Sequence, residues 1–270
     1  MPPRIFAGRL PTASEFAQHD NGAAKNPAAA EESPRQKNRI QAIALPLKTY
    51  FVTGTDTGVG KTVLTVLLAR FLRGRGIAAA AIKPVSSGRR GDARQLFRAM
   101  DGALPLDDIN PWHFGAPLAP ALAARLEGKK ILLGDVLAHC RRMRKRFDAL
   151  VVEGAGGLLS PLGEDFDSRD ILTALRATPI IAAPNRLGTV NAVLLTLEAL
   201  PQSLRRKAKI VTMQTEPQKR PTSAARSNPA LLEQLCGAEV FTLPWLGRKI
   251  VYPSGRMGSR VRRTLQGILQ

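Results

Sequence analysis

Residues 49–62 combine a short apolar strand with a glycine-rich loop that ends in Gly60-Lys61-Thr62. Backbone N–H groups of such a loop turn inward around phosphate oxygens, and the following helix points its positive N-terminus at the same anion. We expect Lys61 to reach the terminal phosphates and the Thr62 hydroxyl to contact Mg²⁺. Apolar residues then recur at helical spacing as far as Leu72. The sequence therefore predicts a phosphate-binding loop between a strand and a helix.

The spacing of this loop departs from the usual motif. Five residues separate Gly54 from Gly60, whereas the usual motif has four residues between its first glycine and Gly-Lys-[Ser/Thr]. The loop is thus a variant. The plain alternative is a chance glycine-rich turn, and the position directly between a strand and a helix argues against it.

Charged side chains follow two further apolar strands. Lys83 follows residues 77–82, Glu153 follows residues 150–152, and Asp92 opens a helical segment soon after Lys83. Phosphoryl transfer needs cations against the phosphates and carboxylates that hold Mg²⁺. Taken singly, Lys83 also fits a surface lysine and Asp92 a helix N-terminal acid. Taken together, they indicate a site at the carboxyl ends of the strands.

Strand-length and helix-length segments alternate from residue 48 onward. The strands are almost continuously apolar, which is typical of a parallel sheet covered on both faces. We therefore predict an α/β fold with a mostly parallel sheet, helices on both faces and a P-loop NTPase-like arrangement. The predicted strands are 49–53, 77–82, 150–152, 179–183, 210–213 and 240–243. The predicted helices are 61–74, 92–100, 118–127, 131–147, 170–176, 190–200 and 231–235.

Composition limits the class of protein. The chain has 270 residues, of which 44% are hydrophobic, enough for one α/β domain. Residues 1–47 show no sustained periodicity, so we expect a disordered extension there and a single P-loop α/β domain over 48–270 with a basic C-terminal segment. The two cysteines, Cys140 and Cys236, have no metal-binding spacing and suit the cytoplasm. No apolar stretch approaches the ~20 residues that span a bilayer.

The formal net charge of +19 admits anionic partners. Aromatic residues are sparse and do not alternate with the basic runs, as a platform for single-stranded nucleic acid requires. We therefore interpret the charge as a solvated basic surface and expect small-molecule substrates, without nucleic acid or a membrane.

Several motifs resemble those of the dethiobiotin synthetase family, in family order, over about residues 48–247. The five-residue loop spacing is also similar to that of the family. The matching segments are 54–62, 83–88, 110–114 (Asn-Pro-Trp-His-Phe), 152–162, 186–191 and 243–246.

The resemblance implies an ATP-dependent ring closure in biotin biosynthesis. An amine of 7,8-diaminopelargonic acid reacts with CO₂ to give a carbamate, and the carbamate attacks the γ-phosphate of ATP. The second amine then attacks the mixed anhydride, expels phosphate and closes the cyclic urea of dethiobiotin. Because two anions must meet, the site needs dense positive charge.

The resemblance also implies roles for individual residues, with ATP and Mg²⁺ as cofactors and a homodimer as the assembly. Lys83 would contact the carbamate and the transferring phosphoryl group, with Lys61 on the phosphates. Substrate contacts would come from Thr57, Lys83, Ser87, Leu187, Gly188 and Asn191, the last three reaching across the dimer interface. Metal ligands would be Thr62, Asp92 and Glu153. Nucleotide contacts would come from Gly58, Val59, Gly60, Lys61, Thr62, Val63, Glu153, Gly154, Ala155, Gly156, Gln214, Pro244, Trp245 and Leu246. A helix start packed on the sheet is the alternative for Leu187, Gly188 and Asn191.

Three features depart from the family pattern. Gln214 stands where the family often has the adenine-reading Asn, which leaves nucleotide preference open. Residues 224–228 lack the Tyr that can reach the partner's substrate, and the tail after Leu246 is basic where an acidic stretch is expected.

Three other classes remain as alternatives. A corrin-ring amidotransferase normally carries a glutaminase domain with a nucleophilic Cys, and too little chain follows residue 247 for one. A partitioning or scaffolding ATPase that binds DNA usually has an additional lysine near the loop start, where this chain reads Gly-Thr-Asp-Thr at 54–57. A degenerate synthetase that binds nucleotide without turnover is the third, and the intact lysines and carboxylates oppose it.

Overall fold

The computed structural model describes residues 48–217, 220–247 and 257–270. The chain divides into two units, Met1–Leu45 and Pro46–Gln270, and the described residues all belong to the second. The predicted disordered extension over 1–47 lies outside the described residues, as do residues 248–256 of the basic stretch after Leu246. The proposed domain boundary stays a prediction.

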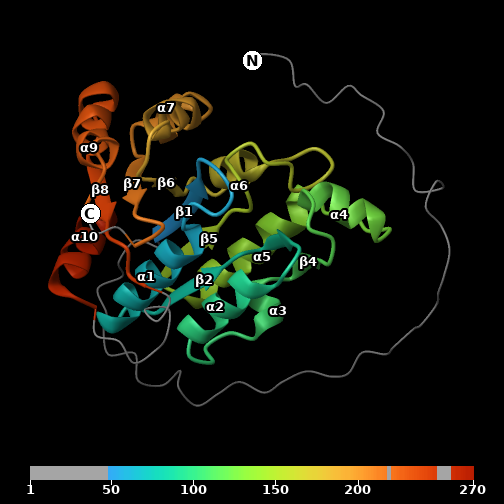
Figure 1. Cartoon of the computed structure of the whole chain (residues 1–270). Helices are drawn as coiled ribbons and strands as arrows, with labels where there is room; N and C mark the ends of the chain where they lie inside the picture. Colours follow the sequence, from blue (N-terminus) through green and yellow to red (C-terminus); the bar gives the residue numbers. More distant parts are fainter. Residues whose placement is uncertain (1–47, 218–219, 248–256) are drawn as a thin grey trace. The chain divides into compact units, whose positions relative to one another are not determined.

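Six parallel strands form the central sheet, in the order β2-β5-β1-β6-β7-β8 (Figure 1). The predicted mostly parallel α/β fold is confirmed. The strands are β1 (Lys48–Gly54), β2 (Ala79–Ile82), β5 (Ala149–Glu153), β6 (Thr178–Pro184), β7 (Lys209–Met213) and β8 (Val240–Leu243). A separate parallel pair consists of β3 (Val85–Ser87) and β4 (Trp112–Phe114).

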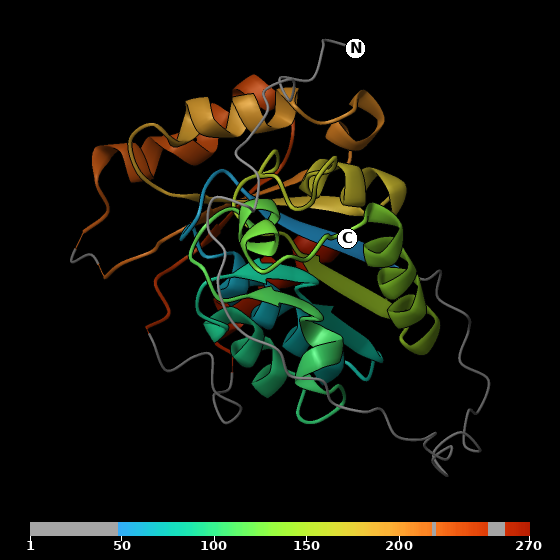
Figure 2. The same ribbon diagram turned by 90° about the vertical axis from the view of Figure 1, so that its right-hand side faces the viewer.

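Helices cover both faces of the sheet, as Figures 1 and 2 show. Alternate residues of β1 enter different apolar clusters. Phe51 packs with residues of α5, α6 and α7, whereas Val52 packs with residues of α1 and α10. The helices are α1 (Lys61–Gly74), α2 (Gly91–Ala99), α3 (Leu106–Ile109), α4 (Pro120–Leu126), α5 (Leu133–Arg146), α6 (Ser168–Ala174), α7 (Thr189–Glu198), α8 (Gln202–Arg205), α9 (Ser223–Cys236) and α10 (Ser259–Leu269).

Helix α1 begins and ends where the sequence predicts. Gly60 precedes it with φ near 100°, a conformation that favours glycine, and most residues of the helix are buried. Those in the same apolar cluster as Val52 include Leu64, Leu67, Leu68 and Phe71, which recur at spacings of three and four. The N-terminus of α1 therefore lies directly after the loop that follows β1.

The register of the sheet brings the functional strand ends together. Val52 of β1 pairs with Glu153 of β5, and Ile82 of β2 pairs with Val152 of β5. Because all three strands run parallel, the glycine-rich loop, Lys83 and Glu153 lie at one edge of the sheet.

Helix α9 is much longer than the predicted 231–235, because Pro229 does not break it. Proline lacks the N–H that would bond the carbonyl four residues earlier. Here that carbonyl, Ala225 O, accepts a hydrogen bond from Asn185 Nδ2 at 2.9 Å instead. A side chain from the end of β6 thus replaces the missing helical donor.

Some elements have no counterpart among the predictions. The strands β3 and β4 have three residues each, and α3 and α8 have four, too few for periodicity to register. Within the described ranges, no helix is both long and apolar enough to cross a membrane.

Candidate active site

The loop between β1 and α1 depends on glycine at several positions. A Cβ on Gly54 would lie 2.7 Å from Val59 Cγ2, and Gly58 and Gly60 have φ of 75° and 100°. Lys61 at the start of α1 folds back, and its Nζ donates to Asp56 O at 2.7 Å. Burial lowers the pKa of Lys61 to about 8, and this effect outweighs the opposing charge of Glu153. A bound anion would therefore stabilise the charged form of Lys61.

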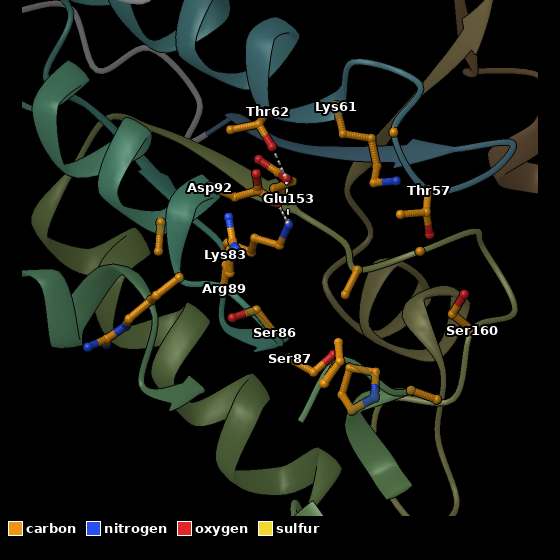
Figure 3. Close-up of a pocket in the computed structure, with 18 of the residues that line it drawn as sticks. Thr57, Lys61, Thr62, Lys83, Ser86, Ser87, Arg89, Asp92, Glu153 and Ser160 are labelled. Atoms are coloured by element: carbon orange, nitrogen blue, oxygen red, sulfur yellow. Dashed lines mark hydrogen bonds and ion pairs between the residues drawn. The ribbon is translucent and has the colours of Figure 1, made fainter. Parts of the chain in front are cut away.

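Lys83 lies between the two predicted metal-binding carboxylates (Figure 3). Its Nζ is 2.5 Å from Asp92 Oδ2 and 3.0 Å from Glu153 Oε1. The Thr62 hydroxyl donates to the same Glu153 Oε1 at 2.7 Å. Burial lowers the pKa of Lys83, but the carboxylates of Glu153 and Asp92 raise it further, so the pKa lies well above its usual value. Residues from β5, α1 and α2 thus meet around one buried ammonium group.

The donor set around Glu153 fits Mg²⁺. Glu153 is 1% exposed, and its Oε2 has no hydrogen-bond partner among the described residues. A buried carboxylate oxygen without a partner is costly, and a cation beside it removes that cost. Mg²⁺ is typically bound by one or two carboxylates, water and substrate phosphates. Glu153, Asp92 and the Thr62 hydroxyl supply ligands of this kind.

A cavity of about 730 Å³ opens over this network. It brings together twelve residues that the sequence predicts for the site: Thr57, Gly58, Gly60, Lys61, Thr62, Val63, Lys83, Ser87, Asp92, Glu153, Ala155 and Gly156. Val59 and Gly154 are buried and are not among the residues that line the cavity. A Cβ on Gly154 would lie 2.9 Å from Ser168 Oγ, so glycine there lets the turn after β5 pack closely.

The predicted adenine-contacting residues lie outside this cavity. Gln214 follows β7, and Pro244, Trp245 and Leu246 follow β8, the adjacent strand. The two segments are joined by a hydrogen bond from Gln214 N to Leu243 O at 2.9 Å. They lie at the same sheet edge as the loop, because the side chain of Met213 approaches within 3.0 Å of a Cβ placed on Gly60.

The predicted dimer-crossing residues also lie outside the cavity, at the start of α7. Leu187 is 88% exposed, Asn191 is exposed, and Gly188 precedes the helix with φ near 90°. Asn228 of α9 donates to Arg186 O at 2.9 Å and holds this turn in place. The turn is thus fixed in shape while it presents an apolar side chain to solvent.

The cavity has further lining residues to which the sequence assigns no role. Ser86 and Ser160 supply hydroxyls, and Arg89 and Arg90 supply guanidinium groups. Both serines lie in segments that match family motifs, Ser86 in 83–88 and Ser160 in 152–162, and a turn places Ser160 at the cavity. Its Oγ accepts from Gly157 N at 2.8 Å.

Arg90 is held by protein partners. It donates to Asp107 Oδ1 at 2.7 Å and to Asn110 O at 2.6 Å. Asn110, from the Asn-Pro-Trp-His-Phe motif, is fully buried and accepts hydrogen bonds from Ser86 and Arg90, which both line the cavity. That motif therefore supports two residues of the cavity lining.

The comparisons with known proteins agree on most of the chain. A family model described as an AAA domain matches residues 48–248. The chain is 43% identical over 204 residues to a protein of Anaeromyxobacter sp. strain K named ATP-dependent dethiobiotin synthetase BioD, covering 74% of this chain and 91% of that protein. It is 37% identical over 200 residues to the protein of that name from Bacillus subtilis strain 168, covering 72% and 86%.

Among solved structures, the chain is similar to the MinC:MinD cell division protein complex of Aquifex aeolicus. The TM-score is 0.46 and the sequence identity 14%, with coverage of 80% of this chain and 86% of that chain.

The glycine-rich loop between β1 and α1, the parallel sheet and the matching AAA domain define a P-loop nucleotide-binding protein. Within that class, the chain belongs to the family of ATP-dependent dethiobiotin synthetases. The resemblance read from the sequence motifs is confirmed. The protein is thus an ATP-dependent ligase of biotin biosynthesis, and the DNA-binding ATPase and amidotransferase alternatives are not favoured.

Proposed function

We propose that this enzyme converts 7,8-diaminopelargonic acid, CO₂ and ATP into dethiobiotin, ADP and phosphate. One observation carries the proposal. In a chain of this family, Lys61, Lys83, Asp92 and Glu153 converge on a single cavity although they come from four separate segments. A reaction that joins two anions requires cations collected in this way.

In the first step, an amine nitrogen of the substrate attacks CO₂ and loses a proton, which gives a carbamate. We assign Lys83 to the carbamate oxygens, because its buried ammonium keeps its charge beside them. Thr57 and Ser87 line the same cavity and are assigned to hydrogen bonds with the diamine or the carbamate.

In the second step, a carbamate oxygen attacks the γ-phosphorus of ATP, and ADP leaves. Lys61 and the N–H groups of Gly58–Val63 are assigned to the phosphate oxygens. Thr62, Asp92 and Glu153 would hold Mg²⁺, which neutralises phosphate charge when bound. The glycine-rich turn Glu153–Gly156 borders the same space.

In the third step, the second amine attacks the carbonyl carbon of the carbamic–phosphoric anhydride. The bond between the carbonyl carbon and the bridging oxygen breaks, and phosphate leaves with that oxygen. The attacking amine loses a proton.

The adenine site is assigned to Gln214, Pro244, Trp245 and Leu246. Gln214 offers the amide group that reads adenine edges, and Trp245 is 39% exposed beside the loop edge of the sheet, where it can stack on a base. ATP is the expected nucleotide.

The assembly is assigned as a homodimer. Leu187, Gly188 and Asn191 form a shaped, solvent-facing turn that does not reach the cavity of its own chain, which suits a contribution to the substrate carboxylate of a second copy.

The free cysteines Cys140 and Cys236 are consistent with the cytoplasm.

The purified protein with Mg²⁺, bicarbonate and ATP, with and without the diamine, tests the proposal. We expect ADP release that depends on the diamine, with one dethiobiotin, identified by mass, per ADP. ADP release independent of the diamine would contradict it and favour an ATPase. If ATP gives no turnover, the same assay with other nucleoside triphosphates tests the choice that Gln214 leaves open.

A further inference from the structure

Two consecutive serines of β3 line the cavity beside Lys83, as Figure 3 shows. Ser87 already has an assigned role, but Ser86 has none. Ser86 is 7% exposed, so its hydroxyl must find protein partners or serve a ligand. The hydrogen bonds around Ser86 determine whether its hydroxyl can donate to a ligand or only accept from one.

The amide of Asn110 has only one orientation that satisfies its neighbours. Its Nδ2 donates to Lys83 O at 2.7 Å, which directs Oδ1 toward Ser86 Oγ at 3.0 Å. Arg90 Nε donates to the same Oδ1 at 3.1 Å. Because a carbonyl oxygen can only accept, the single proton of the Ser86 hydroxyl is donated to Asn110.

His113 then has to be the donor in its contact with Ser86. Its Nδ1 lies 3.2 Å from Ser86 Oγ, and the Ser86 proton is already committed to Asn110. The ring therefore carries a proton on Nδ1, as it does in the cation and in one neutral tautomer. Ser86 Oγ is left with one lone pair and no proton for the cavity.

The hydroxyl proton of Ser87 is also used in a hydrogen bond within the protein. Its hydroxyl donates to Leu118 O at 2.5 Å, and Leu118 also lines the cavity. Both serines can therefore only accept hydrogen bonds from a ligand. An acceptor-only wall selects N–H groups and repels carboxylate or carbonyl oxygens.

We propose that Ser86 is a substrate-specificity residue that accepts a hydrogen bond from an amine of the diamine, alongside Ser87. This rests on the proposed function. An amine held by its N–H groups keeps its lone pair free to attack CO₂ or the anhydride. Asn110 and His113 are positioning residues that aim the Ser86 oxygen, and the same wall directs the substrate carboxylate elsewhere.

Calorimetric binding of substrate analogues tests this role. The diamine and the two monoamines that lack either the 7-amino or the 8-amino group are titrated with Mg²⁺ and a non-hydrolysable ATP analogue present. Ser86→Ala should weaken the diamine and only one monoamine, each by about tenfold. Affinity for the ATP analogue should stay within about twofold, because Ser86 takes no part in nucleotide binding.

Ser86→Cys is the second variant, because it keeps the size of the side chain while sulfur is a weak acceptor. It should show the same selective loss. Ser227→Ala, an exposed serine of α9, is the control and should bind all ligands as the unchanged protein does.

Unchanged diamine affinity in both Ser86 variants overturns the role of Ser86, as does equal weakening of both monoamines and the nucleotide. If the unchanged protein binds no diamine, that result contradicts the proposed function, and the assignment of Ser86 is contradicted with it. The two failures are thus distinguished by the unchanged protein alone.

Discussion

Lys83 Nζ lies 3.0 Å from Glu153 Oε1, although 70 residues separate them in the chain. The contact exists because β2 and β5 are neighbours in the sheet and run in the same direction. The same ammonium contacts Asp92, so Lys83 rests in the place where the two carboxylates would hold a metal ion. A metal ion there would compete with Lys83 for Glu153 Oε1 and Asp92 Oδ2, while Glu153 Oε2 has no partner among the described residues, and this competition has a measurable consequence.

Replacing Lys83 with methionine should tighten divalent metal binding in the absence of nucleotide. Removing the cation leaves two carboxylates without their counter-charge and frees the space between them. We expect Mn²⁺, followed by electron paramagnetic resonance, to bind about tenfold more tightly to Lys83→Met, while turnover is lost. Arg94→Met on the same helix as Asp92 serves as the control, since Arg94 is exposed and does not line the cavity. Weaker Mn²⁺ binding by Lys83→Met would contradict the competition.

ATP binding should take up protons at alkaline pH. Burial lowers the pKa of Lys61 to about 8, so above this pH the free protein holds the amine largely neutral. Phosphate oxygens favour the charged form and raise that pKa again. Proton uptake is therefore expected at pH 9 and should fade below pH 8, where Lys61 is already charged.

Calorimetry of ATP binding in buffers of different ionisation enthalpy measures this uptake. Lys61→Arg should bind ATP without it, because arginine stays charged at every accessible pH. The same uptake in Lys61→Arg as in the unchanged protein would assign the proton to another group.

Gly156→Ala should destabilise the turn after β5, whereas Gly157→Ala should not. Gly156 has φ near 67°, and its Cβ would lie 2.2 Å from Ser160 Oγ. The nearest atom to a Cβ on Gly157 is Gly54 O at 3.6 Å, an ordinary contact. Urea denaturation should show a loss of about 1–3 kcal/mol in the free energy of unfolding for Gly156→Ala. Equal stability of the two variants would refute the steric account.

Leu187→Asp should shift the protein from dimer to monomer. Leu187 is 88% exposed in the single chain, and burying its apolar side chain in an interface is favourable, whereas burying a carboxylate is not. Light scattering after gel filtration measures the mass. Leu132→Asp is the control, because Leu132 directly precedes α5 and is also exposed, at 54%. A monomeric unchanged protein would end the dimer proposal.

The sequence predicted the elements that carry strong local signals. The glycine-rich loop and helix α1 follow from the spacing of Gly60 and the apolar residues after it, and the observed helix has the predicted bounds. Lys83 and Glu153 were predicted together because polar residues that end parallel strands meet at one edge. The order of the strands was therefore sufficient to predict that Lys83 and Glu153 lie at one cavity, while their roles stay predictions.

Features that depend on distant partners could not be predicted. Helix α9 continues through Pro229 because Asn185, which lies outside the helix, donates a hydrogen bond to Ala225 O. The orientation of Ser86 depends on Asn110 and His113, which lie 24 and 27 residues away. Neither relationship leaves a periodic pattern, so spacing alone gives no signal for it.

Oxygen transfer from bicarbonate to phosphate tests the central claim most directly. The unchanged protein is supplied with ¹⁸O-labelled bicarbonate, ATP, Mg²⁺ and the diamine, and the phosphate released is examined by mass. If a carbamate oxygen attacks the γ-phosphorus, phosphate carries one labelled oxygen and dethiobiotin keeps labelled oxygen in its ring carbonyl. Unlabelled phosphate alongside dethiobiotin would show that ATP is cleaved by water, which contradicts the carbamate mechanism.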